Sequence, residues 1–402
     1  MSADPRAGGE QAAGIGFGLL LSLTVLISLV PFSIDGFLPA FPAAREALDT
    51  SASMLQLSMS SLLIGVAVGQ LVFGPMSDRW GRRGPLILGA TVCAAAAVVC
   101  ALAPTAAVLV AARFVQGVAS ASGMVISKAI VRDRSAGRST VRALTTTTVA
   151  GGALNILAPV IGGLLLAGFG WRGPLWFIAA CAILVLLLVV FVVPETHPLG
   201  TRGPGERWFG LAGLARHVMN RRFRAYVLIQ AGSYGSLIAY VAASPFVYQS
   251  ILGIDAVGYG LLFAVNSAIG VTLNFVVNRL LPARDSHRIV AIGLTGSLTG
   301  TVATALASAV GAPTWVVAAC LTWSMATINL NGPNLVGLAL NRVSRSNGSA
   351  AAAIGFAQFC TGAVVSPLVG LGGGALLPMT VTMLALGGGS LVLLLLLPPH
   401  PE

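Results

Sequence analysis

Two ionisable side chains touch the long apolar runs of this sequence and are its first candidates for chemistry. Asp35 lies at the end of the first run, and no other carboxylate outside a recognisable loop touches a run. Arg113 lies about seven residues inside the fourth run. A charge inside a membrane helix costs about 2.5–3.5 kcal/mol on insertion scales, so it is rarely without a role. From these residues alone, Asp35 is more readily a helix cap at the membrane edge than a titrating group, and Arg113 lies deep for a snorkelling side chain.

The residue sets that enzymes use are missing from the sequence. No carboxylate pair and no serine–histidine set falls inside an apolar run, and no G-x-x-x-x-G-K-[ST] loop for a nucleotide is present. The five cysteines form no CxxC pair and are expected to pack as small apolar residues. All four histidines lie in predicted loops or in the tail: His197, His217, His287 and His400. We therefore expect a protein that is not an enzyme and that uses no metal and no cofactor.

The elements that must position Asp35 and Arg113 are predicted transmembrane helices. The 402 residues are 56% hydrophobic and 9% charged, whereas soluble domains carry about 25% charged residues. A helix needs about 20 apolar residues to cross a bilayer. The apolar runs therefore predict an all-α membrane protein with twelve spans, at about 14–34, 52–76, 84–103, 106–127, 143–167, 173–194, 225–248, 257–279, 289–310, 314–340, 350–370 and 375–397.

The longest polar stretch divides these spans into two sets of six. Residues 195–224 are rich in Arg, Gly and Pro. We predict an N-terminal six-helix bundle over 1–194, a linker over 195–224 and a C-terminal six-helix bundle over 225–402. Duplicated bundles of this kind are common in transporters.

The cationic residues predict the orientation. The segments on one side of the predicted membrane carry 20 Lys and Arg residues and those on the other side carry 2, while Arg113 lies in a span. Cytoplasmic loops are the ones enriched in Lys and Arg, so both termini and the linker are expected in the cytoplasm. The net charge of +11 then needs no nucleic acid partner. The first run is long enough to span a bilayer and is not followed by a cleavage pattern, so we expect no cleaved signal peptide.

The segment GPMSDRWGRR, residues 74–83, joins the second and third spans. Gly74 and Pro75 are expected to end a helix, and the following charges can pin helix ends through hydrogen bonds and helix dipoles. The alternative is an ordinary positively charged loop. The spacing G-x-x-x-D-R-x-G-R-R resembles the signature loop of the major facilitator superfamily, with its twelve-helix, two-bundle fold. The resemblance implies a cytoplasmic gating role for the motif residues Gly74, Asp78, Arg79, Gly81 and Arg82.

Two further strings resemble motifs of the same family. RFVQGVASA, residues 113–121, is similar to the R-x-x-Q-G motif, which implies a proton-coupling role for Arg113. LAPVIGG, residues 157–163, is similar to the G-P-x-x-G-G motif of antiporters, although Ala158 replaces the usual glycine. The antiporter resemblance assigns a kinked, closely packed helix to Pro159, Gly162 and Gly163, which plain helix packing would also explain.

Three strings resemble the bicyclomycin-resistance (Bcr/CflA) drug:proton antiporters: SIDGFLPAFP at 33–42, SKAIVRD at 127–133 and SPFVYQ at 244–249. This resemblance implies that Asp35 lies in a central cavity and carries protons. Because no other carboxylate outside a recognisable loop touches a predicted span, we expect Arg113 to interact with Asp35, directly or through water or Gln116.

Polar and aromatic residues at membrane depth are the candidates for substrate contact. Most membrane asparagines bond between helices, so a structural role is the competing interpretation. Asn331-Gly332-Pro333 is the expected helix break, and breaks tend to line cavities. The predicted substrate-binding residues are Asp35, Tyr234, Tyr240, Asn266, Asn331 and Gln358.

The sequence thus predicts a monomeric, multi-pass protein of the inner (cytoplasmic) membrane. The expected activity is proton-coupled export of small, largely apolar drugs or metabolites, such as an antibiotic, and would confer resistance. The alternative is a facilitator or importer of the same fold for a small neutral metabolite.

Overall fold

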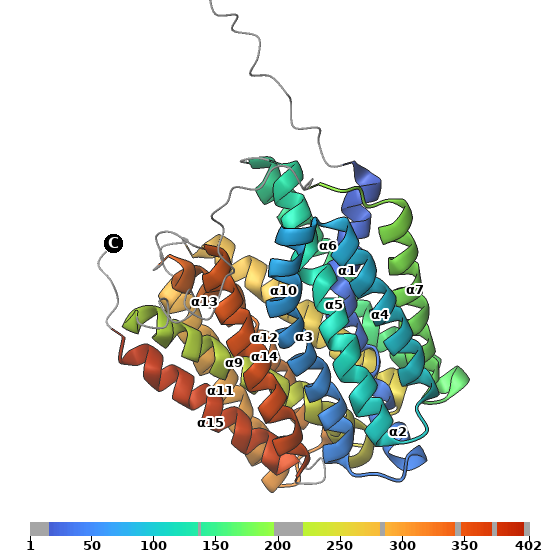
Figure 1. Cartoon of the computed structure of the whole chain (residues 1–402). Coiled ribbons are helices and arrows are strands. Elements are labelled where there is room, and N and C mark those ends of the chain that lie inside the picture. The colour runs from blue at the N-terminus through green and yellow to red at the C-terminus, as the bar shows by residue number, and fades with distance from the viewer. Residues whose placement is uncertain are drawn as a thin grey trace, which may run out of the picture.

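The computed structural model describes residues 16–135, 138–196, 220–281, 286–341, 347–371 and 376–397. These ranges fold into helices joined by short turns, with no β-strand among them (Figure 1). Eleven helical segments are long and apolar enough to cross a membrane. A twelfth predicted span, 314–340, is divided between two shorter helices. The predicted all-α membrane fold is therefore confirmed.

The first six spans begin within about five residues of the predicted starts, but the first continues to Ala47 and the fourth to Arg134, beyond the predicted ends at 34 and 127. The first consists of α1 and two short continuations, η1 and α2. In chain order the elements are α1 (Phe17–Asp35), η1 (Leu38–Ala40), α2 (Phe41–Ala47), α3 (Ala52–Trp80), α4 (Arg83–Leu102), α5 (Ala106–Arg134), α6 (Arg138–Phe169) and α7 (Gly173–Phe191).

The last six spans include one with a π-helical end, η2, and one that is broken. The elements are α9 (Arg221–Pro245), η2 (Phe246–Ile251), α10 (Ala256–Leu280), α11 (Ser286–Ala309), α12 (Thr314–Ile328), α13 (Asn331–Leu340), α14 (Asn347–Gly370) and α15 (Leu376–Leu395). The break falls just before the predicted Asn331-Gly332-Pro333. Pro333 then lies in the first turn of α13, where its missing N–H removes no helical bond.

Two predicted loops are helical. Gly74 and Pro75 do not end α3, which continues to Trp80. Proline is tolerated in membrane helices because nearby groups can satisfy the backbone carbonyl that it leaves without a partner. The segment 128–142, counted as a loop, consists mostly of the last turns of α5 and the first turns of α6. Most of the predicted linker 195–224 lies outside the described residues.

The helices form two bundles, one on each side in Figure 1. In the first bundle α5 packs against both α3 and α4, and in the second α9 packs against α14 and α15 and α11 packs against α12. The main contacts between the bundles pair α3 with α14 and α6 with α10. The predicted two-bundle architecture is confirmed. The two bundles are called the first half and the second half below.

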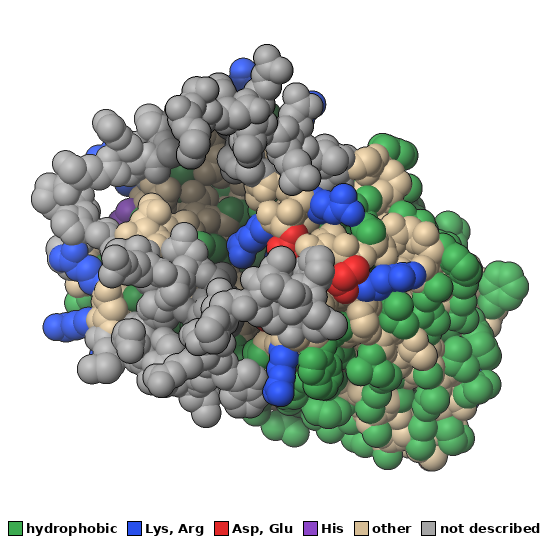
Figure 2. Space-filling model, turned by 45° about the horizontal axis from the view of Figure 1, so that its top comes forward, with side chains coloured by type: hydrophobic (Ala, Val, Ile, Leu, Met, Phe, Trp, Pro, Cys, Tyr) green, Lys and Arg blue, Asp and Glu red, His purple; other side chains and the backbone are tan. Residues whose placement is uncertain are grey.

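The two ends of the molecule differ in how the halves meet. One end, here the arginine-rich end, carries residues such as Arg82, Arg132 and Arg279. Towards it each half has its own hydrophobic core, around Phe73 in the first half and around Phe223 in the second. At the opposite end a single core contains residues of both halves. The halves are therefore joined at the opposite end, and Figure 2 shows a hollow on the arginine-rich face.

Candidate functional site

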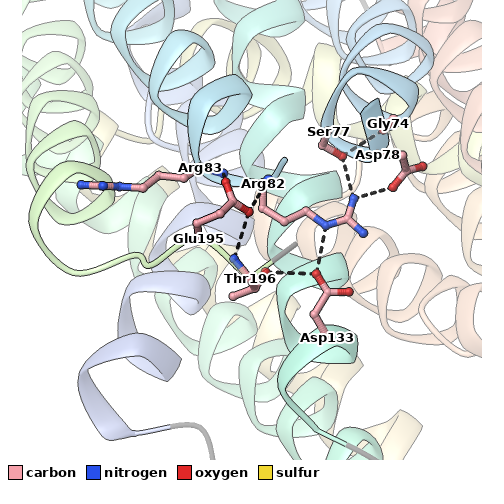
Figure 3. A network of polar contacts seen from close by, with 8 residues as sticks. All are labelled: Gly74, Ser77, Asp78, Arg82, Arg83, Asp133, Glu195 and Thr196. Atoms are coloured by element: carbon pink, nitrogen blue, oxygen red, sulfur yellow. Dashed lines mark hydrogen bonds and ion pairs between the residues drawn. The ribbon is translucent and has the colours of Figure 1, made fainter. Parts of the chain in front are cut away.

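The predicted gating motif forms an ion-pair network at the arginine-rich end (Figure 3). The Arg82 side chain is 7% exposed. Its Nε donates to Asp133 of α5 at 3.0 Å, and its Nη1 donates to Asp78 and, at 3.1 Å, to the Ser77 hydroxyl. Burial alone would lower the pKa of Arg82, but its hydrogen bonds and charge attraction to Asp133 and Asp78 outweigh burial and raise that pKa. Arg82 therefore stays charged and ties α3 to α5.

Glu195, just beyond α7, completes the same network. Its carboxylate accepts the backbone N–H groups of Arg82 at 2.8 Å and Arg83 at 3.0 Å, at the start of α4, and of Thr196 at 2.9 Å. The Thr196 hydroxyl donates to Asp133 at 3.0 Å. Free N–H groups and the helix dipole make a helix start favourable for a carboxylate. Glu195 thereby fixes the end of α7 to α4 and α5 (Figure 3).

Gly81 is required by this arrangement. Its φ of +88° lies in the left-handed region, and a Cβ there would lie 2.7 Å from a Glu195 oxygen. Of the other predicted motif residues, Gly74 supplies the carbonyl that Ser77 binds, and Arg79 is exposed at the end of α3. These bonds of the network join α3, α4, α5 and the end of α7, and so they hold these helices of the first half as one unit.

Arg113 lies at a break in the first span. α1 ends at Asp35, where the Phe37 N–H turns back to the Ile34 carbonyl at 3.2 Å. The Ser33 carbonyl, which that N–H would bind in a continuing helix, is therefore free for another donor. Arg113 Nη1 donates to it at 3.1 Å and to Gln116 Oε1 at 3.2 Å. The Arg113 guanidinium also lies 4.9 Å from the centre of the Phe37 ring.

These contacts make Arg113 a buried cap for α1. The side chain is 2% exposed, so it does not snorkel. Carbonyl dipoles at a helix C-terminus and an aromatic face both attract a cation. Arg113 binds Gln116, but no direct hydrogen bond or ion pair joins Arg113 to Asp35. The expected link between the two through water or Gln116 stays a prediction.

Asp35 lies inside the first span, because η1 and α2 continue that span to Ala47. It is partly exposed and forms no hydrogen bond or ion pair with any described residue. Its charge is close enough to Tyr234 of α9 and Tyr259 of α10 to act on both hydroxyl groups. Asp35 is thus a carboxylate at the break in the first span, without a partner among the described residues.

The predicted antiporter motif lies at the crossing of α6 and α10. A Cβ on Gly163 would lie 2.6 Å from the Ala256 carbonyl oxygen, and one on Gly260 would lie 2.5 Å from the Pro159 carbonyl oxygen. A Cβ on Gly162 would lie 2.1 Å from the carbonyl oxygen of Gly36, beside Asp35. Small residues let membrane helices approach this closely. The motif therefore joins the two halves and contacts the break in the first span.

Three hydrogen bonds, which the sequence did not predict, also cross between the halves. Gln56 Nε2 donates to the Ala242 carbonyl at 2.9 Å, the Ser366 hydroxyl donates to the Gln56 carbonyl at 3.0 Å, and Gln249 Nε2 donates to the Pro39 carbonyl at 3.0 Å. They join α3 to α9 and α14, and η2 to η1. All of them add to the closure at the opposite end.

The predicted substrate residues fall into two groups. Tyr234 and Gln358 are partly exposed, and Tyr234 packs edge-on against Phe359 with ring centres 6.1 Å apart. The other three side chains are buried in packing between helices: Tyr240, Asn266 and Asn331.

The buried group has partners of its own. Asn266 donates to the Tyr240 hydroxyl at 2.9 Å and accepts from Thr322 at 2.6 Å. Asn331 donates to the Ser233 hydroxyl at 3.0 Å. Tyr234 therefore lies within electrostatic range of Asp35, and Asn331 lies away from any exposed surface in this conformation.

Sequence reasoning left several of these residues without a role. Asp133 ends the SKAIVRD string, and Glu195 and Thr196 follow directly after the sixth span. A carboxylate next to the end of an apolar run was the available signal. Tyr259 could not be distinguished from any other aromatic residue in an apolar run.

The comparisons with known proteins agree with this architecture. The profile of the Major Facilitator Superfamily matches residues 21–367. The chain is 32% identical to the uncharacterized MFS-type transporter YdgK of Bacillus subtilis over 91% of each chain. It is 28% identical to a bicyclomycin resistance protein homolog of Haemophilus influenzae, over 88% of this chain and 89% of the relative. It is also 30% identical to the multidrug resistance protein MdtL of Escherichia coli over 64% of each.

Solved structures share the fold. A D-xylose-proton symporter superimposes with a TM-score of 0.72 at 18% identity, covering 94% of this chain and 96% of the symporter. A bacterial homologue of the lysosomal transporter Spinster, in an inward-facing and occupied conformation, gives 0.73 at 16% identity, covering 94% and 95%. At such identities these likenesses concern the fold alone.

Proposed function

Because the chain belongs to the Major Facilitator Superfamily, we propose that it exports small, largely apolar drugs or metabolites in exchange for protons. As a member of this family it is a transporter and not an enzyme. The similarity to a bicyclomycin resistance protein homolog and to a multidrug resistance protein supports drugs as cargo. The observation that carries proton exchange is Asp35, a carboxylate at the break in the first span that has no partner among the described residues and lies within electrostatic range of Tyr234 and Tyr259 of the second half.

The orientation follows from charge. The arginine-rich end belongs in the cytoplasm, because loops rich in Lys and Arg stay on that side. Both termini are then cytoplasmic, and the hollow of Figure 2 opens towards the cytoplasm. Cargo enters from the cytoplasm or the inner leaflet while the outer end is closed by the shared core.

Exchange proceeds by rocking of the two halves. Asp35 takes up a proton when the site opens outward and releases it when the site opens inward. Cargo and proton compete, because cargo favours the ionised form of Asp35. One proton moving through about 100 mV yields about 2.3 kcal/mol, which supports a cargo gradient of about 40-fold. The proton gradient is the energy source, and the proposed transporter works as a monomer without a cofactor.

Transport in proteoliposomes with an imposed pH gradient tests this function. Wild type should accumulate labelled cargo against its gradient. Asp35→Asn should lose this accumulation while keeping its expression and membrane insertion, because the amide cannot carry a proton, and Asp35→Glu should retain part of it. A well-inserted Asp35→Asn protein that still accumulates cargo would refute proton exchange through Asp35.

The same assay separates exporter from facilitator. A facilitator would only equalise cargo across the membrane, at a rate that the pH gradient does not change. The cargo itself is found by drug-susceptibility profiling of a pump-deficient strain that expresses wild type or Asp35→Asn. Resistance that requires Asp35 identifies the transported compounds.

A further inference from the structure

A small cavity lies beside Arg113, lined by residues of α1, α3 and α5 and by Phe37 and Phe41. Its lining is mostly apolar, and its polar members are Arg113, Ser33 and Ser58. These three residues are 1–2% exposed, so the polar part of the lining is buried within the first half. It leaves about 10 Å³ for the centre of a water molecule. A buried site of this size has room for about one water.

The Arg113 guanidinium has a donor to spare at this cavity. Its Nη1 donates to the Ser33 carbonyl and to Gln116, whereas its Nη2 is buried and has no partner among the described residues. Leaving a buried donor without a partner is unfavourable, more so for a charged group. A ligand that accepts from Nη2 would remove that penalty.

The two serines determine which ligand fits. The Ser33 hydroxyl donates to the Val30 carbonyl at 2.9 Å, and the Ser58 hydroxyl donates to the Leu55 carbonyl at 2.6 Å. Both hydroxyl hydrogens are therefore used, and only oxygen lone pairs remain for the cavity. A small anion could accept from Arg113 but would meet the lone pairs of both serines. Water can accept from Arg113 and donate to both serines.

We propose that this cavity is a binding site for one structural water, held by Arg113 Nη2 and by the hydroxyl oxygens of Ser33 and Ser58. The water links α5 to α1 and α3 directly beside the break at Asp35. It completes the hydrogen bonds of a cation that has no carboxylate partner among the described residues. This site does not depend on the cargo or on proton exchange.

Radiolytic footprinting of the purified wild-type protein tests the site without any substitution. X-ray pulses convert bound water to hydroxyl radicals, which oxidise nearby sulfur. Met59 lines the cavity and is 4% exposed, and Met325 in the second half is 2% exposed and serves as the matched reference. Met59 should be oxidised several-fold faster than Met325. Equal rates would overturn the proposal.

Two substitutions at Ser58 test the same site, because a water-filled cavity and a dry cavity predict opposite changes in stability. Ser58→Ala removes one partner but keeps the room for water, whereas Ser58→Val fills the room and expels the water. With water bound, Ser58→Val should have the lower melting temperature, and its Met59 oxidation should fall to the Met325 rate. In a dry apolar cavity, filling would stabilise instead. A Ser58→Val protein at least as stable as Ser58→Ala would therefore reject the bound water.

Discussion

Arg82, Arg113 and Asp35 are charged side chains with different surroundings. Arg82 is paired with two carboxylates. Arg113 has only carbonyl oxygens and the Phe37 ring, and Asp35 has no partner among the described residues. A charge that is already paired can change state only by breaking its pair. Of the three, Asp35 is the one that can exchange a proton without that loss, and the two arginines are positioning residues.

The cap on α1 gives a prediction at this scale. Arg113→Lys keeps the positive charge but replaces the planar fork with a single ammonium group, so the bonds to the Ser33 carbonyl and Gln116 cannot both keep their geometry. Hydrogen bonds to charged groups contribute about 1.5–3 kcal/mol, so the initial export rate should fall by at least about tenfold.

Arg279→Lys, an exposed exchange at the end of α10, is the matched control and should export normally. If Arg113→Lys exports as fast as this control, the cation alone is sufficient and its fork geometry is unimportant.

At the scale of elements, α4 depends on a residue more than 100 positions away. No side chain within its own segment caps its start, and Glu195 binds the backbone N–H groups of Arg82 and Arg83 instead. One carboxylate thus connects the end of the sixth span to the start of the third.

Removal of this cap should be measurable in stability. Losing a helix cap costs about 0.5–2 kcal/mol, so Glu195→Ala should lower the free energy of unfolding by about 1–2 kcal/mol in mixed-micelle denaturation. Glu195→Gln keeps one acceptor oxygen and should fall between Glu195→Ala and wild type. Glu46→Ala, at an exposed glutamate of α2, is the control. Equal midpoints for Glu195→Ala and Glu46→Ala would show that the cap adds no stability.

The ion pairs of the same network are expected to affect the export turnover. Asp78→Asn removes one of the two carboxylates on Arg82 but lies at the arginine-rich end, away from Asp35. Export turnover should fall by roughly tenfold, which corresponds to about 1.4 kcal/mol, while cargo affinity stays the same. Binding and efflux measured on one purified preparation separate the two effects. Near-normal efflux by Asp78→Asn would show that residues 74–83 have no gating role and only set the orientation of the protein in the membrane.

At the scale of the whole molecule, the closure at the opposite end depends on backbone contact. At Gly163 and Gly260 the backbone of one helix lies close to a carbonyl oxygen of the other, so α6 and α10 are in backbone contact. Three hydrogen bonds from Gln56, Ser366 and Gln249 add to the shared core. Packed interfaces of this kind have discrete arrangements rather than a continuous range. A change of one methyl group can therefore shift the balance between closed and open forms.

Gly260→Ala should disfavour the closed form. The new Cβ would lie 2.5 Å from the Pro159 carbonyl oxygen, so the backbones of α6 and α10 must separate. Spin labels at Arg45 and Trp315, near the opposite end, should report a larger share of long distances in this variant. Gly388→Ala, whose Cβ would meet nothing within 4 Å, is the control. Identical distance distributions for the two variants would show that the α6–α10 crossing does not contribute to the closure.

The sequence alone was sufficient for the twelve spans, their division into two bundles and the family. Hydropathy over about 20 residues depends on the bilayer thickness, so it needs no knowledge of neighbours. Proline was the exception. Pro75 was expected to end α3, yet the helix continues to Trp80 because a membrane helix can satisfy the freed carbonyl locally.

Tertiary structure decided which partners these residues have. An apolar run shows that a residue avoids water but not which helix it faces, so Asn331 and Tyr234 looked alike although only Tyr234 is partly exposed. Arg113 was expected to interact with Asp35, directly or through water or Gln116; no direct bond joins the two, and Arg113 binds the Ser33 carbonyl. Because every residue has a backbone carbonyl, the sequence does not show which carbonyl accepts this hydrogen bond. That carbonyl becomes available only where the chain breaks its own helix and another helix packs within hydrogen-bond distance.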